Sequence, residues 1–198
     1  MSIFNNIFFV KKNANLSNND SVPCKKCETF LGILLAGFMS WFLFLWVANN
    51  IVLNHTWSMP VGIYIKTLEP IKVGSIVEFC GPKWIVQRGY ALPVKACHGG
   101  SRILKHVGAM PGQKISVMET KKGKEILVDG KETGAFILSH DSKGQQLPYF
   151  KGGTVPEKSI FLLSTFNKRS LDSRYFGFVN EAQIIGAYKC LLCFDKPF

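Results

Sequence analysis

Thr29–Val47 reads TFLGILLAGFMSWFLFLWV, a run of 19 residues without a charged side chain. An α-helix of this length rises roughly 28 Å, close to the ~30 Å hydrocarbon core of a bilayer. A helix in the core of a soluble protein shows a polar face, and this run has none. The sequence therefore predicts a transmembrane helix over residues 29–48. A cleaved signal peptide is the alternative, but it needs a shorter apolar run and small residues at the cut, whereas Asn49 and Asn50 follow Ala48.

The charges on either side of this run set its expected orientation. Lys11, Lys12, Lys25 and Lys26 precede it, and the next basic residue is Lys66. Basic residues that flank a span stay on the cytoplasmic side of the membrane. We therefore expect a cytoplasmic tail over residues 1–28, one pass through a bacterial inner membrane, and a periplasmic domain over residues 49–198.

The composition narrows the class of protein further. The 198 residues include 24 basic and 13 acidic ones, a formal charge of +11, and 47% are hydrophobic. This apolar fraction excludes a disordered chain, and the charges that interrupt the rest of the sequence exclude a polytopic membrane protein. Residues 49–198 hold 20 basic and 11 acidic residues, so most of the positive charge lies beyond the span. We therefore expect an anionic lipid surface as a partner rather than nucleic acid, for which no recognition motif is present.

The part of the chain after the span is expected to form β structure. Short segments alternate in polarity or are β-branched, and turn-forming residues separate them. No long segment beyond the span repeats its apolar residues with a helical period. The pattern predicts a mainly β, antiparallel, barrel-like domain with a surface loop over residues 139–158. The predicted strands are Val61–Lys66, Ser75–Phe79, Ile103–Ala109, Ile115–Glu119, Glu125–Val128, Ile160–Ser164, Tyr175–Val179 and Ala182–Tyr188.

Ser58 is the first candidate for chemistry. It lies 11 residues after Val47, at the end of a polar turn and before an apolar strand. Pro60 and Gly62 restrict the backbone path that follows it. Such a serine fits a nucleophile close in sequence to the membrane, although most serines in loops have no chemical role.

Lys105 is the more unusual residue. On an extended strand it shares a face with Ile103, Val107 and Ala109. A lysine among apolar neighbours loses hydration, which lowers its pKa and lets the neutral amine act as a general base. The alternative is a lysine on an edge strand that reaches water and guards against aggregation.

A third polar segment, SLDSRYFG, occupies residues 170–177. Asp172 and Arg174 are spaced to form an ion pair, and Ser170 has a hydroxyl for a hydrogen bond. A salt-bridged turn before a strand explains the same residues, and such a turn is compatible with a supporting role at a catalytic site.

These three segments together resemble type I signal peptidases. SMP at residues 58–60, LKHVGAMPG at residues 104–112 and SLDSRYFGFV at residues 170–179 follow one span in the family's order. TxSMPxGxY at residues 56–64, and FCGP at residues 79–82 followed by RGY at residues 88–90 and by Cys97, are similar to the conjugative transfer (TraF-type) subgroup. The resemblance covers residues 54 to about 188. It implies the antiparallel β fold of signal peptidases after one transmembrane helix.

The resemblance also implies roles and partners. It makes Ser58 the nucleophile and Lys105 the general base, with supporting roles for Thr56 (side-chain oxyanion donor), Ser170 (orienting the lysine), and Asp172 and Arg174 (bracing their loop). His106 departs from the family, because many members have arginine there, and so does LSTF at residues 163–166. The implied substrate is a precursor protein held in the same membrane, such as a pilin or another conjugation subunit. No cofactor and no metal are implied.

The cysteines beyond the span are expected to be oxidised if the compartment is a periplasm. A Cys80–Cys97 bridge would close a loop of about 18 residues and contribute ~3 kcal/mol in the chain-entropy model. The subgroup resemblance implies the same pair. Cys190 and Cys193 are compatible with a bridge, with free thiols or with contact to lipid.

Three other functions stay open at this point. A housekeeping type I signal peptidase would have the same dyad. A non-catalytic, membrane-anchored module of a conjugation or secretion complex is a second alternative, but it should have lost Ser58 or Lys105. A serine–histidine–aspartate site is the third, although His106 faces the opposite side of its strand from Lys105.

Overall fold

The computed structural model describes residues 25–194, and the chain divides into two units with a boundary between Leu45 and Trp46. Helix α1 spans Lys25–Asn50. Within it, Thr29–Asn50 is long and apolar enough to cross a membrane, and its side chains are exposed. The predicted span thus falls inside a helix. The last four residues of the predicted tail are helical as well, and the rest of that tail, residues 1–24, lies outside the described residues.

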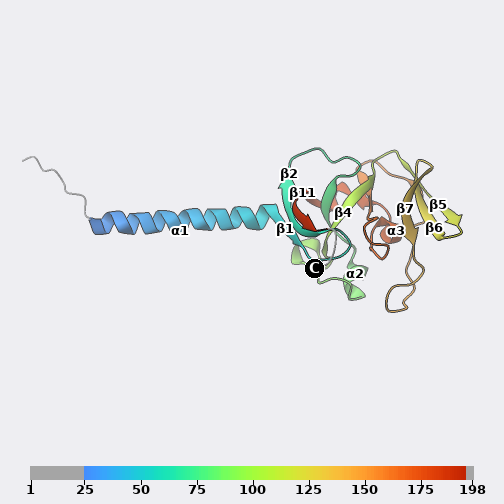
Figure 1. Cartoon of the computed structure of the whole chain (residues 1–198), viewed down its shortest axis with the longest axis horizontal. Helices are drawn as coiled ribbons and strands as arrows, with labels where there is room; N and C mark the ends of the chain where they lie inside the picture. Colours follow the sequence, from blue (N-terminus) through green and yellow to red (C-terminus); the bar gives the residue numbers. More distant parts are fainter. Residues whose placement is uncertain (1–24, 195–198) are drawn as a thin grey trace, which may run out of the picture. The chain divides into compact units, whose positions relative to one another are not determined.

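The second unit is mainly β (Figure 1), which confirms the expected fold class. Its helical segments are short: α2 (Lys83–Gln87), α3 (Ser173–Phe176) and the 3-10 turns η1 (Lys95–Cys97) and η2 (Glu181–Gln183). The strands are β1 (Ile51–Asn54), β2 (Val61–Thr67), β3 (Ile76–Cys80), β4 (Arg102–Ala109), β5 (Lys114–Thr120), β6 (Gly123–Val128), β7 (Lys131–Ile137), β8 (Gly153–Thr154), β9 (Ser159–Leu163), β10 (Val179–Asn180) and β11 (Ile184–Phe194).

The strands form two antiparallel sheets. One has the order β1-β2-β11-β3-β4-β9-β10 and the other the order β7-β6-β5-β8. In Figure 1, β5, β6 and β7 lie at the opposite end of the domain from β1 and β2. The expected antiparallel architecture is thus confirmed, with the described strands divided between two sheets.

Strand β4 is the interior strand that carries the lysine. It pairs with β3 on one side and with β9 on the other. Its Val107 packs in the core of the larger sheet, and its Ala109 packs in the core under the smaller sheet, with Ile115, Ile126 and Phe161. Burial of this apolar surface stabilises the strand from both ends. Lys105 is paired with Val77 of β3 and is buried, which excludes the alternative of a lysine that reaches water.

One predicted strand, Tyr175–Val179, is wrong. Its alternating aromatic residues mimic a strand, but Asp172 caps a one-turn helix, α3, by accepting a hydrogen bond from the Arg174 backbone. Gly177 then ends the turn with a φ of 76°, in a region that favours glycine. The cap and the glycine override the alternation, and only Val179–Asn180 extend as β10.

The other differences are additions. β1 follows directly on the apolar helix, so its apolar residues continue the same run and give no separate signal. β7 begins after a two-residue turn, and its polar first half, Lys131–Thr133, hides the strand. The expected loop over residues 139–158 contains the two-residue strand β8, which pairs with β5.

Candidate active site

The turn between β1 and β2 presents Ser58, and Asn54 determines its shape. The Asn54 side-chain amide donates to the carbonyls of Thr56, Met59 and Pro60 at 3.0, 3.2 and 2.9 Å. Its Oδ1 accepts from the backbone N and the Oγ1 of Thr56 at 3.2 and 2.8 Å. Asn54 is buried, and a buried polar group with satisfied hydrogen bonds specifies one conformation. Sequence reasoning missed this residue, because a lone asparagine at a strand end gives no signal.

Two further contacts hold the chain around Ser58. The Ser164 hydroxyl, just after β9, donates to the Ser58 carbonyl. On the far side of the turn, β2 lies so close to β11 that a Cβ on Gly62 would sit 2.0 Å from the Leu192 carbonyl oxygen. Gly62 is therefore required by close approach, and Ser164 acquires a positioning role that its sequence context did not reveal.

Lys105 is buried and faces Ser58. Its Nζ lies 2.6 Å from the Ser58 Oγ, and the residue is 2% exposed. Burial lowers the pKa of Lys105 from 10.5 to about 8, because the charged amine loses its hydration. The nearby Asp172 carboxylate raises this pKa and the Arg174 guanidinium lowers it. The amine is therefore held close to a serine hydroxyl with its pKa near the neutral range.

Asp172 and Arg174 form the buried ion pair that the sequence predicts. Two guanidinium nitrogens of Arg174, Nε and Nη2, contact the two carboxylate oxygens of Asp172 at 2.7 and 2.8 Å. The remaining donors reach the carbonyls of Phe136 at 2.7 Å and Ser170 at 2.9 Å. The other Asp172 bonds include one from the Ser164 backbone at 3.0 Å. The pair thus joins the segment that contains Ser170 to the end of β9 and to β7.

Thr56 and Ser170 both lie at the site. The Thr56 Oγ1 is 3.4 Å from the Ser58 Oγ, and its proton is directed to Asn54. Ser170 is buried in the lining of the same cleft, and its Oγ has no hydrogen-bond partner among residues 25–194. The expected bond from Ser170 to Lys105 is therefore not formed in this structure, although the hydroxyl is placed at the site.

A cleft of about 380 Å³ opens over the serine and the lysine. Thr56, Ser58, Lys105 and Ser170 line it together with apolar residues such as Val52 and Leu104. Such a cleft, apolar with a few converging polar groups, is the form that substrate sites take. A nucleophilic hydroxyl beside a desolvated amine is suited to acyl transfer.

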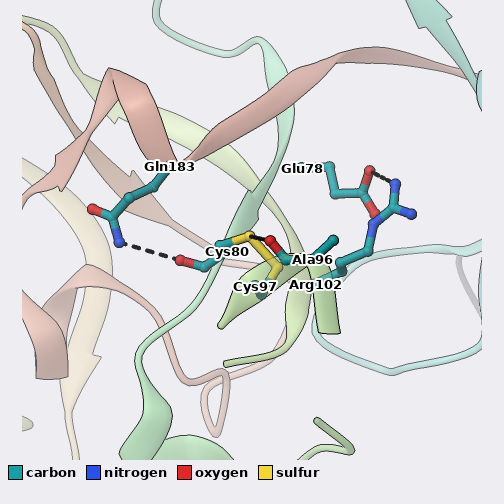
Figure 2. Close-up of a disulfide and its surroundings, with 6 residues drawn as sticks. All are labelled: Glu78, Cys80, Ala96, Cys97, Arg102 and Gln183. Atoms are coloured by element: carbon teal, nitrogen blue, oxygen red, sulfur yellow. Dashed lines mark hydrogen bonds and ion pairs between the residues drawn. A yellow bond between two sulfur atoms is a disulfide. The ribbon is translucent and has the colours of Figure 1, made fainter. Parts of the chain in front are cut away.

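A disulfide joins Cys80 to Cys97, with the two Cα atoms 5.2 Å apart (Figure 2). It closes a segment whose residues Ile85 and Tyr90 line one wall of the cleft. The Tyr90 hydroxyl donates to Asp141, and Arg88 donates to the Gln146 carbonyl at 2.9 Å. The bridge therefore ties down a wall of the cleft at one end, and these two bonds tie it down at the other.

Removal of this disulfide is expected to destabilise the domain. Cys80→Ala/Cys97→Ala should lower the free energy of unfolding by about 3 kcal/mol, because the separation of 17 residues closes a long loop. Denaturant unfolding measures the change. A second bridge joins Cys190 to Cys193, only 3 residues apart. Cys190→Ser/Cys193→Ser is the matched control, with an expected loss of about 2 kcal/mol. An unchanged midpoint for Cys80→Ala/Cys97→Ala would show that the long loop is not closed by this bond.

Two of the described histidines, His106 and His140, have bonding partners other than Ser58. His106 Nδ1 is 3.2 Å from the Gly74 carbonyl, and His140 Nδ1 is 3.0 Å from the Ser139 hydroxyl. Within the described part of the chain, no group of three His, Cys, Asp or Glu residues is placed to hold a metal ion. Ser58 is paired with Lys105 instead of a histidine.

Comparison with known proteins agrees with this geometry. Residues 27–193 match the profile of the family described as "Signal peptidase, peptidase S26". The chain belongs to this signal peptidase family. The family resemblance seen in the sequence is thereby confirmed, and the match extends over nearly the whole described part of the chain.

Curated relatives point to a subgroup of this signal peptidase family. The chain is 33% identical to "Conjugal transfer protein TraF" of Agrobacterium fabrum over 153 residues, which cover 72% of this chain and 82% of that protein. It is 36% identical to "Probable conjugal transfer protein TraF" of Sinorhizobium fredii, with 68% and 72% covered. It is 31% identical to "Plasmid transfer protein TraF" of Escherichia coli, with 70% and 81% covered. The predicted TraF-type subgroup is confirmed by these matches.

Among solved structures, the chain is similar to a signal peptidase I from Enterococcus faecalis. The TM-score is 0.37 at 23% identity, and the match covers 61% of this chain and 98% of the other.

Proposed function

We propose that this signal peptidase family member is a membrane-anchored serine endopeptidase with a Ser58–Lys105 dyad. The observation that carries the proposal is the distance of 2.6 Å between the Lys105 Nζ and the Ser58 Oγ, together with the burial of the lysine. A neutral amine at this distance is able to take the hydroxyl proton. Serine–lysine pairs are an established variant of serine catalysis.

The residues suit a two-step acyl transfer. The Ser58 Oγ forms a bond to the scissile carbonyl carbon while its proton moves to the Lys105 Nζ. The Thr56 hydroxyl, which donates to the Asn54 Oδ1 in this structure, rotates to donate a hydrogen bond to the resulting oxyanion, a type of contact worth roughly 3 kcal/mol. The C–N bond then breaks, and the proton on Lys105 passes to the leaving amine. Neutral Lys105 next takes a proton from water while the water oxygen bonds to the ester carbonyl carbon. The C–O bond to Ser58 then breaks, and the proton on Lys105 returns to the Ser58 Oγ.

Three surrounding residues support this chemistry in the proposal. Asp172 raises the pKa of Lys105 and Arg174 lowers it, so the guanidinium offsets part of the carboxylate's effect, and burial remains the largest cause of the lowered pKa. Ser170 has an unused buried hydroxyl in the cleft, which is free to turn toward the Lys105 Nζ during turnover.

The substrate is proposed to be a membrane-held precursor of a conjugation apparatus, such as a pilin. The names of the relatives, conjugal and plasmid transfer proteins, favour this specialised role over housekeeping secretion. The lysines before the apolar helix support a cytoplasmic N-terminus, a single pass and a periplasmic catalytic domain. The net positive charge of that domain favours an anionic lipid surface, and not nucleic acid, as its second partner.

A processing assay tests this proposal. The full chain is co-expressed with a pilin-like precursor or with an unrelated secretory precursor, and cleavage is followed by gel mobility and mass. The specialised role predicts cleavage of the first precursor only. Equal cleavage of both would favour a housekeeping peptidase. No cleavage of either precursor, with the chain folded in the membrane, would favour a non-catalytic module.

The pH dependence of processing follows from the pKa of Lys105. Only the neutral amine is a base, and with a pKa of about 8 roughly a tenth of it is neutral near pH 7. We expect kcat/KM to rise about tenfold between about pH 7 and pH 9 and then to level off. The rate is measured with one precursor across this range in mixed buffers of constant ionic strength. A rate that still rises severalfold between about pH 9 and pH 10 would contradict a buried base, because an exposed lysine with a pKa of about 10.4 behaves in that way.

A further inference from the structure

An ion pair without an assigned role lies in the wall of the cleft. The Arg102 Nη2 and the Glu78 Oε2 are 2.5 Å apart, and both residues line the cleft that contains Ser58 and Lys105. The two partners differ in exposure. The Glu78 side chain is 4% exposed, and the Arg102 side chain is 42% exposed. The Glu78 carboxylate is thus buried in the wall of the cleft, and the Arg102 guanidinium remains accessible to solvent.

Residues on the neighbouring strands β3 and β11 hold this ion pair in place. The Tyr188 hydroxyl donates to the same Glu78 oxygen at 2.9 Å. Burial, together with the Glu78 carboxylate, raises the pKa of Tyr188 to about 12, so the hydroxyl keeps the proton that it donates. Arg102 pairs across strands with Cys80, which the disulfide holds to Cys97. Figure 2 shows the Arg102–Glu78 pair on one side of the bridge and Gln183, bound to the Cys80 carbonyl, on the other.

The Arg102 guanidinium has hydrogen-bond donors that its contact with Glu78 does not use. A guanidinium has five N–H donors, and one contact with Glu78 leaves others for a ligand. Among the described residues that line the cleft, Glu78 is the sole carboxylate, and Arg169 adds a second guanidinium. An arginine held in this way recognises carboxylates by paired, charge-assisted hydrogen bonds.

The strand geometry gives the position of the recognised group. Arg102 precedes Lys105 by three residues on β4, which corresponds to roughly 10 Å along an extended strand. This odd spacing places the two side chains on opposite faces of β4, and both residues line the same cleft. An extended substrate advances by the same rise per residue. A carboxylate bound to Arg102 therefore lies about two to four residues from the bond that Ser58 attacks.

We propose that Arg102 is a specificity-determining residue that binds an acidic side chain of the precursor, about two to four residues from the scissile bond. The proposal rests on the proposed peptidase function and adds a substrate class to it. Glu78 and Tyr188 act as positioning residues that hold the guanidinium toward the cleft.

The test uses short extended peptides that carry a single Asp at successive positions, each matched with an Asn peptide. The full chain in detergent micelles is the enzyme, and the ratio of kcat/KM for Asp over Asn is measured at each position. We expect a ratio of about ten at one position within two to four residues of the cut. Arg102→Gln should bring this ratio close to one through KM. The double variant Glu78→Gln/Arg102→Gln should do the same without leaving a buried carboxylate unpaired.

Two controls sharpen this test. Lys131→Gln removes an exposed charge from β7, on the smaller sheet, and should keep the ratio near ten. A ratio near one at every position for the wild type would overturn the proposal. A ratio that falls in Arg169→Gln and persists in Arg102→Gln would also overturn it, because it would assign the site to Arg169.

A binding arm separates this inference from the peptidase function. Ser58→Ala is titrated with the same fluorescently labelled peptides, and the affinities for Asp and Asn peptides are compared by anisotropy. A tenfold preference for Asp that depends on Arg102 supports the inference even if the wild type cuts nothing, and in that case only the peptidase proposal fails. Equal affinities, with cleavage intact, overturn the inference alone.

Discussion

Ser58→Ala is expected to lower the rate of precursor processing by roughly 10⁴-fold or more, because it removes the hydroxyl that is proposed to attack the scissile carbonyl. Lys105→Met should have a similar effect. Methionine fills the buried site without a base, so the serine keeps its proton. Residues that act as a unit have strongly non-additive effects, so the double variant should be no slower than either single variant. Processing is measured in membranes that contain equal amounts of each variant.

The Lys105→Arg variant tests whether residue 105 acts as a general base or only as a positive charge. Arginine stays protonated in proteins, so it cannot take the Ser58 proton and should be as inactive as methionine. Ser116→Ala and Lys131→Met, both on the smaller sheet, are the matched controls and should process at the wild-type rate. An active Lys105→Arg variant would contradict the role of Lys105 as a general base.

The second large effect concerns stability. Arg174→Ala is expected to lower the free energy of unfolding by about 3–5 kcal/mol, because it leaves the carboxylate of Asp172 buried and unpaired. Both side chains are almost completely buried, at 1% and 0% exposure. For a domain of this size, the loss corresponds to a fall in Tm of roughly 6–20 °C. Thermal unfolding followed by circular dichroism gives the value.

Two variants test whether the unpaired charge is the cause. Arg169→Ala removes an exposed guanidinium five residues away along the chain and should change the stability by less than about 0.5 kcal/mol. Asp172→Ala/Arg174→Met removes both charges and should lose less than the sum of the two single changes. A Tm for Arg174→Ala within about 2 °C of wild type would show that the pair does not hold the loop.

The sequence predicts the architecture well wherever one local pattern decides it. The apolar run predicts α1, and alternation predicts the strand that places Lys105 among apolar neighbours. It fails for Tyr175–Val179, because a capping carboxylate and a glycine override the alternation. The division of the strands between two sheets was not predicted from the sequence. Strand order depends on pairings between distant segments, which no local pattern contains.

The site was predictable only in part for a related reason. Short motifs contain Ser58, Lys105 and the Asp172–Arg174 pair, and the residue types in these motifs indicate their chemical roles. Asn54 and Ser164 do not, because their roles exist only through hydrogen bonds to the turn, and Ser164 reaches Ser58 across 106 residues. The Glu78–Tyr188 contact likewise spans 110 residues. Such positioning residues become visible once the distant segments are packed together.

The central claim, that Ser58 attacks with Lys105 as its base, is tested most directly by trapping the acyl-enzyme. Excess full-length chain is mixed with a cleavable precursor peptide and quenched in acid within one turnover, and the products are mapped by mass spectrometry. The proposed mechanism predicts an added mass equal to the acyl portion of the peptide, on the fragment that contains Ser58. It also predicts no such adduct in Ser58→Ala or Lys105→Met. An adduct on another residue, or cleavage by Ser58→Ala at the wild-type rate, would contradict the claim.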